Sequence, residues 1–379
     1  MAARDPAADL RRIAFLLERA HEATYRVRAF RSAASALAKV SREELETRAA
    51  AGTLTQLSGV GTVTARCIEE SLAGEEPVYL RRLQSTAGTD LDDASAELRA
   101  ALRGDCHSHS DWSDGGSPIE EMVAAAIDLG HEYLVLTDHS PRLTVARGLD
   151  ADRLRKQLDV VAAINDGLSN VGLERPFRLL TGIEVDILAD GYLDQEDELL
   201  ARLDVVVGSV HSGLRDDSAA MTRRMLTALE SPFLDILGHC TGRLLPRSEQ
   251  PTAKPDEDTE KSERGGRGGE RGRRGGGRGR PESTFDADAV FAKAAELDKA
   301  VEINSRPERL DPPKRLLRAA LEAGCRFTID TDAHAPGQLD WLRYGCERAA
   351  LCGVPVDRVV NSWPADRLLG WTAGHAGRE

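Results

Sequence analysis

From residue 101 onward, the chain alternates short apolar runs with amphipathic helical stretches. Such alternation is typical of βαβ units, in which parallel strands are joined by helices. The expected strands are 102–107, 133–138, 177–185, 205–211, 233–239, 300–305 and 326–332. A helix after the first strand is indicated by Ser117 as its cap, Pro118 in its first turn and Gly130 at its end. We therefore expect an α/β fold with a parallel sheet or barrel.

Histidine is scarce, at nine among 379 residues, yet most histidines follow an expected strand. Those at or just beyond a strand's C-terminal end are His107, His109, His139, His211, His239 and His334. Asp114, Glu184 and Asp332 occupy equivalent positions. In a parallel barrel these ends converge on one face, where active sites lie. Neutral imidazole and carboxylate suit Zn, Mn or Fe, so we expect a site for several divalent metals.

The other reading is that each of these residues is an isolated polar side chain at a strand end. His21, His131 and His375 lie outside the set, and we interpret them as surface residues. Asp138 and Asp186 flank two of the expected ligands. Either one orients a ligand or is a plain strand-end aspartate.

A cluster of divalent cations deprotonates a bridging water at neutral pH and holds the oxygens of a phosphate. No Ser, Cys or His nucleophile is needed, so the expected chemistry is hydrolysis of a phosphoester. Arg306 and Arg243, both near strand ends, are candidate phosphate-binding residues or structural ion-pair partners. Arg147, in the loop after His139, is a further candidate.

Composition narrows the setting of this chemistry. The six cysteines form no CxxC pair, which favours buried free thiols in a reducing compartment. The charged start of the chain has no apolar segment typical of a secretory signal. No run approaches the ~18 apolar residues that a membrane span needs. We expect a cytoplasmic protein without a membrane partner.

One segment, 246–284, breaks the alternation and has almost no apolar residues. Its acidic half leads into RGGRGGERGRRGGGRGR, which holds nine Gly and seven Arg in seventeen residues. Such a segment cannot bury enough surface to offset its ordering entropy, so we expect a disordered insertion within the barrel. It suits single-stranded nucleic acid, or it is a solvated loop.

Residues 1–85 indicate a small all-α domain, and 86–100 a polar linker to a barrel over 101–375. Within the small domain, Gly59, Val60 and Gly61 form a turn before a helix. Such a turn is usually structural, but its backbone amides also suit a DNA phosphate. The candidate DNA-binding residues are Gly59, Val60, Gly61, Arg26, Arg28 and Arg31.

The ordered motifs HSHSDWSDG, TDHS, GIEVDI, SVHSG, ILGHCTGRLL, EINSRPERLD and TDAHAPGQL resemble the polymerase and histidinol phosphatase (PHP) family. The likeness is to the PHP region of bacterial family X DNA polymerases and covers about 101–370. It implies a distorted (β/α)7 TIM-like barrel with three divalent metal ions. The implied ligands are His107, His109, Asp114, His139, Glu184, His211, His239, Asp332 and His334. Glu184 is implied as a bridge, and we expect Glu184, Asp332 and Arg306 to carry catalysis.

YRVRAFRSAA followed by SGVG resembles the helix-hairpin-helix domain of family X polymerases over about 10–83. Only about 15 residues separate this region from the barrel, so there is no room for the palm and fingers domains. We expect no DNA polymerisation. The lyase activity of that family needs a Schiff-base lysine, and Lys39, the only lysine before residue 100, lies outside the helix after SGVG.

Three functions remain open on these grounds. The first is a metal-dependent DNA 3′-5′ exonuclease or 3′-end processing enzyme in DNA repair, with nucleic acid as its partner. The second is a small-molecule phosphatase of the histidinol-phosphate type. The third is a DNA-binding or scaffold protein with a structural metal barrel, which the complete ligand set disfavours. Affinity that falls steeply with salt would favour the first over the second.

Overall fold

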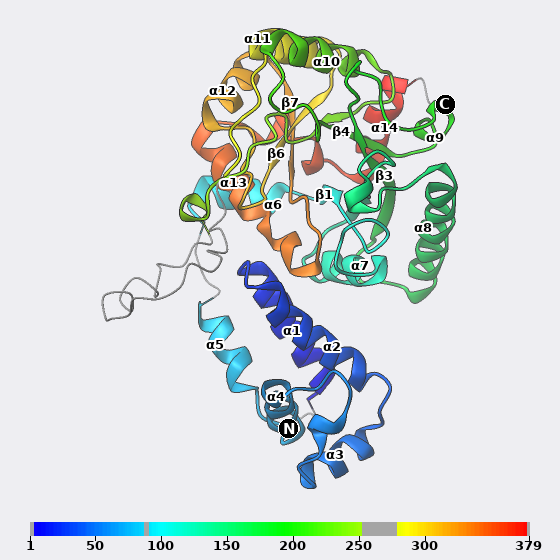
Figure 1. The fold of residues 1–379 in the computed structure, drawn as a ribbon, viewed down its shortest axis with the longest axis vertical. Helices are drawn as coiled ribbons and strands as arrows, with labels where there is room; N and C mark the ends of the chain where they lie inside the picture. Colours follow the sequence, from blue (N-terminus) through cyan, green and yellow to red (C-terminus); the bar gives the residue numbers. More distant parts are fainter. Residues whose placement is uncertain (1–3, 87–90, 252–278, 377–379) are drawn as a thin grey trace, which may run out of the picture. The chain divides into compact units, whose positions relative to one another are not determined.

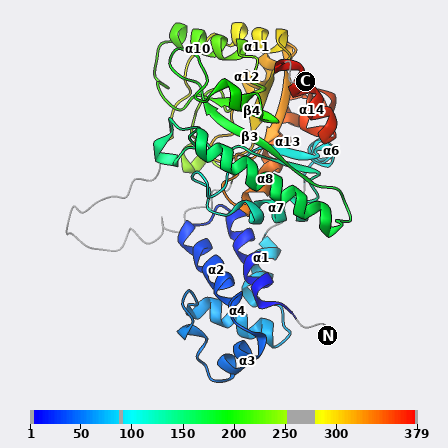
Figure 2. The ribbon, with the colours of Figure 1, turned by 90° about the vertical axis from the view of Figure 1, so that its right-hand side faces the viewer.

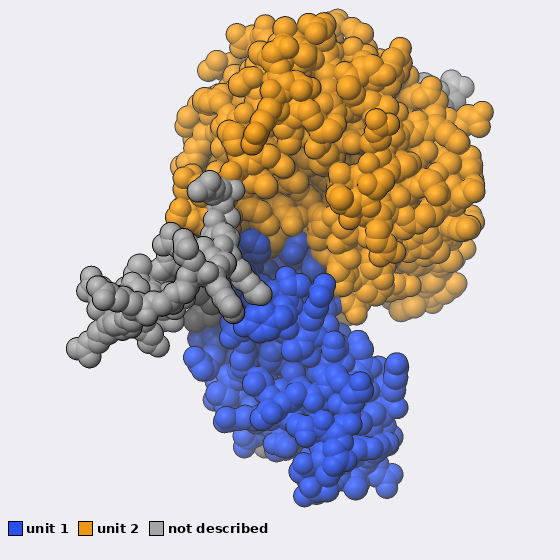
Figure 3. Space-filling model, in the orientation of Figure 1, with its two compact units in different colours: residues 1–91, 335–340 blue, residues 92–334, 341–379 orange. Residues whose placement is uncertain are grey.

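The structure, a computed structural model, describes residues 4–86, 91–251 and 279–376. It divides into two compact units, coloured separately in Figure 3. The smaller unit consists of residues 1–91 and 335–340. The larger unit consists of residues 92–334 and 341–379. A six-residue stretch late in the chain is thus part of the smaller unit.

The larger unit is built on one seven-stranded sheet in which neighbouring strands are parallel and follow chain order. The strands are β1 (Gly104–Ser108), β2 (Tyr133–Leu136), β3 (Arg178–Asp186), β4 (Val205–Ser209), β5 (Ile236–Leu237), β6 (Ala300–Asn304) and β7 (Arg326–Asp330). A parallel bridge between Ser108 and Ala333 brings the first strand beside the end of the last. The sheet is therefore a nearly closed barrel, and the expected TIM-like fold class is confirmed.

Helices cover the outside of this barrel, as Figures 1 and 2 show for α8, α10, α11 and α12. The helices of the larger unit are α6 (Asp93–Ala101), α7 (Ile119–Asp128), α8 (Ala151–Val171), α9 (Asp197–Leu200), α10 (Ser218–Glu230), α11 (Ala287–Glu296), α12 (Lys314–Glu322), α13 (Leu342–Cys352) and α14 (Ala365–Ala376). Strand residues such as Ile183, Val206 and Ile303 are fully buried. Burial on both faces explains why these strands are apolar runs without alternation.

The expectation of a linker over 86–100 is wrong from Asp93 onward, because α6 begins at that residue. Asp92 caps this helix by accepting a hydrogen bond from the Ser95 amide at 2.8 Å. Leu98 is buried in the main core, and α6 contacts α13. Acidic residues at the start of this segment therefore cap a helix instead of marking a solvated connection.

The insertion expected to be disordered over 246–284 is ordered at both ends. The 3₁₀ turn η3 (Arg247–Glu249) follows Pro246, and Arg280 forms an antiparallel bridge with Leu244. Ser283 is buried and donates a hydrogen bond to the Thr241 carbonyl at 2.8 Å. Most of the Arg/Gly run lies outside the described residues.

The smaller unit holds α1 (Pro6–Arg19), α2 (Thr24–Leu37), α3 (Arg42–Ala50), α4 (Thr62–Leu72) and α5 (Val78–Thr86). Its own core includes Leu10, Ile13, Phe30 and Ile68. Its second segment, 335–340, includes most of the turn η4 (Pro336–Trp341). The Gly337 amide of this turn donates a hydrogen bond to the Glu18 carboxylate at 2.9 Å. Arg19 pairs with Asp340 at 2.7 Å. Within the described ranges, no helix is long and apolar enough to cross a membrane.

Candidate metal centre

The structure brings all nine expected ligands together at the C-terminal ends of the strands. They form four overlapping groups whose candidate ligand atoms lie within 4.8 Å of one another. The groups are His109, Asp114, His139 and His334; His107, Glu184 and His239; His107, His109 and Asp332; and His139, Glu184 and His211. The overlap makes one continuous cluster instead of separate sites.

Buried polar atoms in this cluster lack hydrogen-bond partners, which is rare in folded proteins. The atoms that make no hydrogen bond within the described chain include His107 Nε2, both ring nitrogens of His109, His211 Nε2, His239 Nδ1 and Glu184 Oε2. Leaving so many donors and acceptors unsatisfied is costly unless a ligand joins them. Imidazole nitrogens and carboxylate oxygens are donors that divalent transition metals accept, so the residues fit a metal centre.

Glu184 lies at the middle of the cluster. Its carboxylate oxygens are 2.7 Å from His239 Nε2 and 2.9 Å from His139 Nδ1. His211 Nε2 and His107 Nε2 follow at 3.3 and 3.4 Å. Burial alone would raise the pKa of Glu184, but the surrounding imidazoles hold it well below its usual value. Glu184 is thus a fully buried carboxylate that stays ionised.

Asp332 is the second buried carboxylate of the cluster, and its backbone adopts a left-handed conformation with φ of 54°. His109 Nε2 lies 3.5 Å from its Oδ1. Burial opposes ionisation, but Arg306 and Arg309 hold the pKa of Asp332 well below its usual value. Burial and then the neighbouring His334 and His139 lower the pKa of His109. His109 is therefore a neutral imidazole, the form that binds metals.

Two carboxylates behind the cluster fix the orientation of its histidines. Nδ1 of His211 donates to Asp186 Oδ1 at 2.9 Å, which leaves Nε2 toward Glu184. Nδ1 of His107 donates to Glu302 Oε1 at 2.6 Å. Although burial disfavours the charged imidazole, Glu184 and Asp186 raise the pKa of His211 to about 9. Carboxylates in this position select the ring nitrogen that faces a metal.

Sequence reasoning missed Glu302, which lies within β6 and not at its end. Its Oε2 accepts hydrogen bonds from the His239 amide at 2.5 Å and from Asn304 Nδ2 at 3.2 Å. Asn304 Nδ2 also lies 3.3 Å from Asp332 Oδ2. The available signal was a glutamate between the apolar residues of AVEINS, at a position where barrel strands are otherwise apolar.

Asp138 holds a loop and contacts none of the ligand side chains. Its carboxylate accepts hydrogen bonds from Ser110, Ser113 and Gln157. This arrangement fixes the backbone that leads to Asp114. Burial is the main reason that the pKa of Asp138 is raised.

The three candidate phosphate-binding arginines differ in what they contact. Arg306 donates to the Asp332 carbonyl at 2.8 Å and lies beside His334. Arg243 donates to the carbonyls of Arg309 and Leu310, so its guanidinium braces a turn. Arg147 is exposed and adopts a left-handed backbone with φ of 57°.

The expectation that His131 and His375 are surface residues is wrong. His131 is 4% exposed, and burial lowers its pKa to about 3. His375 pairs with the buried Asp235 at 2.9 Å. The sequence around each of these two histidines is typical of an exposed segment. Their burial depends on contacts with residues distant in the sequence. His21 is half-buried.

The candidate DNA-binding residues of the smaller unit separate into two groups. Val60 is buried, and Arg31 pairs with the buried Glu18 at 2.6 Å. Arg26 pairs with Glu22 at 2.8 Å, whereas Arg28 is exposed.

The glycine turn is exposed at Gly59 and Gly61, but not all of its amides are available to a ligand. The Gly61 amide donates to Thr64 Oγ1 at 2.9 Å and so caps α4. Gly59 has a φ of 89°, and an added Cβ would lie 3.1 Å from the Ser32 carbonyl oxygen. Glycine is therefore required at Gly59 by the backbone itself.

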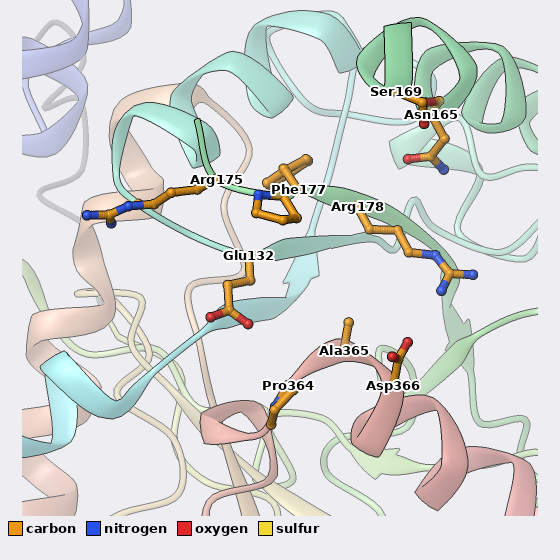
Figure 4. A pocket seen from close by; sticks show the side chains of 11 residues that line it. Glu132, Asn165, Ser169, Arg175, Phe177, Arg178, Pro364, Ala365 and Asp366 are labelled. Atoms are coloured by element: carbon orange, nitrogen blue, oxygen red, sulfur yellow. The ribbon is translucent and has the colours of Figure 1, made fainter. Parts of the chain in front are cut away.

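A hollow of about 870 Å³ lies away from the metal ligands, beside the first residues of β2 and β3 (Figure 4). Arg178 is the first residue of β3, and Glu132 precedes β2. Figure 4 shows the guanidinium groups of Arg175 and Arg178 pointing to opposite sides. In barrels of this class the N-terminal strand ends serve stability and the C-terminal ends serve chemistry.

Comparison with known proteins agrees with these two parts of the chain. A family model described as PHP domain matches residues 105–253, and one described as helix-hairpin-helix domain matches residues 1–77. "DNA polymerase/3'-5' exonuclease PolX" of Bacillus subtilis (strain 168) is 35% identical over 261 residues, which are 69% of this chain. This chain spans only 39% of that relative's length.

Two further similar proteins are covered over most of their own length. A probable phosphatase of Thermoanaerobacter sp. (strain X514) is 23% identical over 269 residues, covering 68% of this chain and 89% of that protein. The solved histidinol phosphate phosphatase of Lactococcus lactis subsp. lactis Il1403 is 17% identical with a TM-score of 0.39, covering 66% of this chain and 92% of that chain. Seven parallel strands and a cluster of His, Asp and Glu side chains that could hold metal ions lie in the part of the chain that includes the PHP match. The chain therefore carries a helix-hairpin-helix domain over residues 1–77 ahead of a PHP domain over residues 105–253.

Proposed function

We propose that this chain is a DNA 3′-5′ exonuclease or 3′-end processing enzyme without polymerase activity. The observation that carries the proposal is the cluster of nine His, Asp and Glu side chains, six of them buried, in a chain that also holds a helix-hairpin-helix domain. The Bacillus relative, whose name includes a 3′-5′ exonuclease, supports the same substrate class. Only residues 87–92 separate α5 from α6, which leaves no space there for a polymerase domain.

We assign the nine clustered side chains as ligands of three divalent ions, with Zn, Mn or Fe as candidates. When bound, such ions supply Lewis acidity and a nucleophile formed from water at neutral pH. Glu184 is the carboxylate that belongs to two of the four groups, and its two oxygens would let it be shared between ions. Glu302 and Asp186 hold the histidine tautomers, and Arg306 holds Asp332 and His334.

The DNA-binding role falls on the exposed part of the smaller unit. Arg28, Gly59 and Gly61 are exposed there, and the first turn of α4 follows them. Helix N-termini and arginines bind phosphates without reading the base sequence. We expect this unit to hold a strand in a way that depends on salt and not on sequence.

A second candidate function is hydrolysis of a small phosphate ester. The probable phosphatase of Thermoanaerobacter matches this chain over 89% of its own length. The same metal centre would serve that reaction, and the smaller unit would then have no part in it.

The deciding experiment is hydrolysis of a 3′-labelled single-stranded oligodeoxynucleotide with added Mn²⁺, run beside histidinol phosphate. His109→Ala is the control, because it removes a candidate metal ligand whose ring nitrogens make no hydrogen bond within the described chain. Stepwise release of nucleotides that is absent in the variant supports the exonuclease. Phosphate release from histidinol phosphate alone supports the small-molecule phosphatase.

A further inference from the structure

Two arginines on the turn after β6 approach the same carboxylate, but they are used differently. Nε of Arg306 donates to Glu308 at 3.1 Å, and its Nη1 donates to the Asp332 carbonyl at 2.8 Å. The same Nη1 lies 2.8 Å from His334 Nδ1. Nε and Nη1 of Arg306 are thus engaged by protein atoms around the candidate metal ligands.

Arg309 stands beside the same site with donors to spare. Its Nε is 3.0 Å from Asp332 Oδ2. Apart from this ion pair no contact satisfies its Nε, and its buried Nη1 makes no hydrogen bond within the described chain. The side chain is only 16% exposed, so water replaces few of the missing partners. Burying a guanidinium with unsatisfied donors is costly, which indicates that a ligand completes it.

The backbone beneath Arg309 is held firmly. Arg243 donates to the Arg309 carbonyl at 2.9 Å and to the next carbonyl, that of Leu310. The Asp311 carboxylate accepts from Thr241 Oγ1 at 2.6 Å, and the Asp311 carbonyl accepts from the Asn304 amide at 2.8 Å. The loop that carries His239 and the strand that carries Glu302 therefore both fix this turn.

We propose that Arg309 binds the phosphate of the substrate at the metal centre, whereas Arg306 is a positioning residue for Asp332 and His334. The inference rests on the proposed phosphoester hydrolysis and names the side chain that receives the phosphate. A guanidinium presents paired N–H donors that match two oxygens of one phosphate, and a lysine does not. The brace from Arg243 keeps that fork aimed at the cluster.

The competing reading is that Arg309 only balances the charge of Asp332. That reading predicts that removing Arg309 changes metal content and leaves phosphate affinity alone. The proposal predicts the reverse. The two are separated by measuring metal content and phosphate binding on the same variants.

The experiment uses the full chain loaded with Mn²⁺ and inorganic phosphate as the probe. Arg309→Met keeps the length of the side chain without its charge, and Arg309→Lys keeps the charge without the fork. Arg223→Met, on the outer helix α10, is the matched control because Arg223 is exposed. Phosphate affinity is measured by titration calorimetry and by inhibition of p-nitrophenyl phosphate hydrolysis, and bound metal by elemental analysis.

We expect Arg309→Met to weaken phosphate binding about 10- to 100-fold with metal content equal to that of Arg223→Met. Arg309→Lys falls between them, and Arg306→Met loses metal. Phosphate affinity of Arg309→Met equal to the control would overturn the proposal. If Arg309→Met loses metal, Arg309→Lys decides, since weak phosphate binding at full metal content supports the proposal and parental binding overturns it.

The same measurements separate this proposal from the proposed function. A parent chain that binds phosphate through Arg309, yet hydrolyses neither DNA nor p-nitrophenyl phosphate, contradicts the function and leaves the phosphate site standing. A parent chain that hydrolyses DNA, with Arg309→Met unaffected in phosphate affinity, contradicts the phosphate site and leaves the function standing.

Discussion

The carboxylate of Glu302 lies 2.6 Å from Nδ1 of His107 and fixes which nitrogen of that imidazole faces the metal cluster. Its other oxygen accepts the His239 amide, so one buried side chain positions two ligands. Asn304 extends the contact to Asp332. The inner face of β6 thus supports the cluster without belonging to it.

Replacing Glu302 by Gln should weaken Mn²⁺ binding by about 10- to 100-fold, as loss of such supporting carboxylates does elsewhere. The amide keeps the shape but removes the charge that holds the Nδ1 proton of His107. Competition with a chelating dye measures the affinity. Glu322→Gln, at an exposed position on α12, is the control. Equal Mn²⁺ affinity in both variants would show that Glu302 is dispensable.

His109→Ala should abolish Mn²⁺-dependent hydrolysis and leave the metal-free fold nearly as stable as the parent. Neither ring nitrogen of His109 makes a hydrogen bond within the described chain, so its loss leaves no partner unsatisfied. Thermal melts in a chelator and with added Mn²⁺ check this. The parent should gain stability from the metal, and the variant should gain much less. Full activity in a variant with reduced metal content would contradict the ligand assignment.

His131→Phe should flatten the loss of stability in acid. Burial and then the charge of Arg99 lower the pKa of His131 to about 3, from 6.5 in the unfolded chain. Between these values the unfolded state binds the extra proton, so stability falls as pH falls, by up to about 1.4 kcal/mol per pH unit. Phe keeps the ring and cannot take up a proton.

Urea denaturation between pH 7 and pH 4 measures this slope in the parent and the variant. Val171→Ala, at an exposed position without a titratable group, is the control and should keep the parental slope. Identical slopes in the parent and His131→Phe would mean that His131 takes up its proton without unfolding.

Arg28→Ala should affect DNA binding, whereas Arg31→Ala should affect the stability of the fold. Arg28 is exposed, so its loss should reduce the salt dependence of DNA binding by about one ion without affecting stability. Arg31 pairs with the buried Glu18, and its loss should destabilise the fold by about 3–5 kcal/mol. Binding of a fluorescent oligonucleotide across salt concentrations, with a melt of each variant, distinguishes them. DNA affinity that is unchanged in Arg28→Ala would remove it from the DNA-binding surface.

The meeting of the nine His, Asp and Glu side chains was predictable because strand ends carry a local signal. An apolar run that ends in a histidine or carboxylate is visible in the sequence, and parallel pairing then brings those ends together. Glu302 gives no such signal, because it points inward from the middle of a strand. The difference between Arg306 and Arg309 was also hidden, since it depends on Glu308, Asp332 and His334 meeting them in space.

Burial decided the other differences between expectation and structure. Nothing near His131 in the sequence distinguishes it from a surface turn, yet packing excludes water from both of its nitrogens. The segment before the barrel looked polar, but Leu98 anchors one face of α6 in the core. Arg31 matched a nucleic-acid pattern, and only the fold shows that Glu18 already pairs with it.

Residues 335–340 belong to the smaller unit. They are synthesised some 250 residues after its last helix, α5, which ends at Thr86. Before that point in synthesis, Glu18 cannot accept the hydrogen bond from the Gly337 amide and Arg19 cannot pair with Asp340. A gene fragment that starts after residue 91 would strip these late residues of their partners. Residues 1–91 alone therefore do not make up the whole smaller unit. Transfer of residues 1–91 to another chain must therefore also include the segment 335–340.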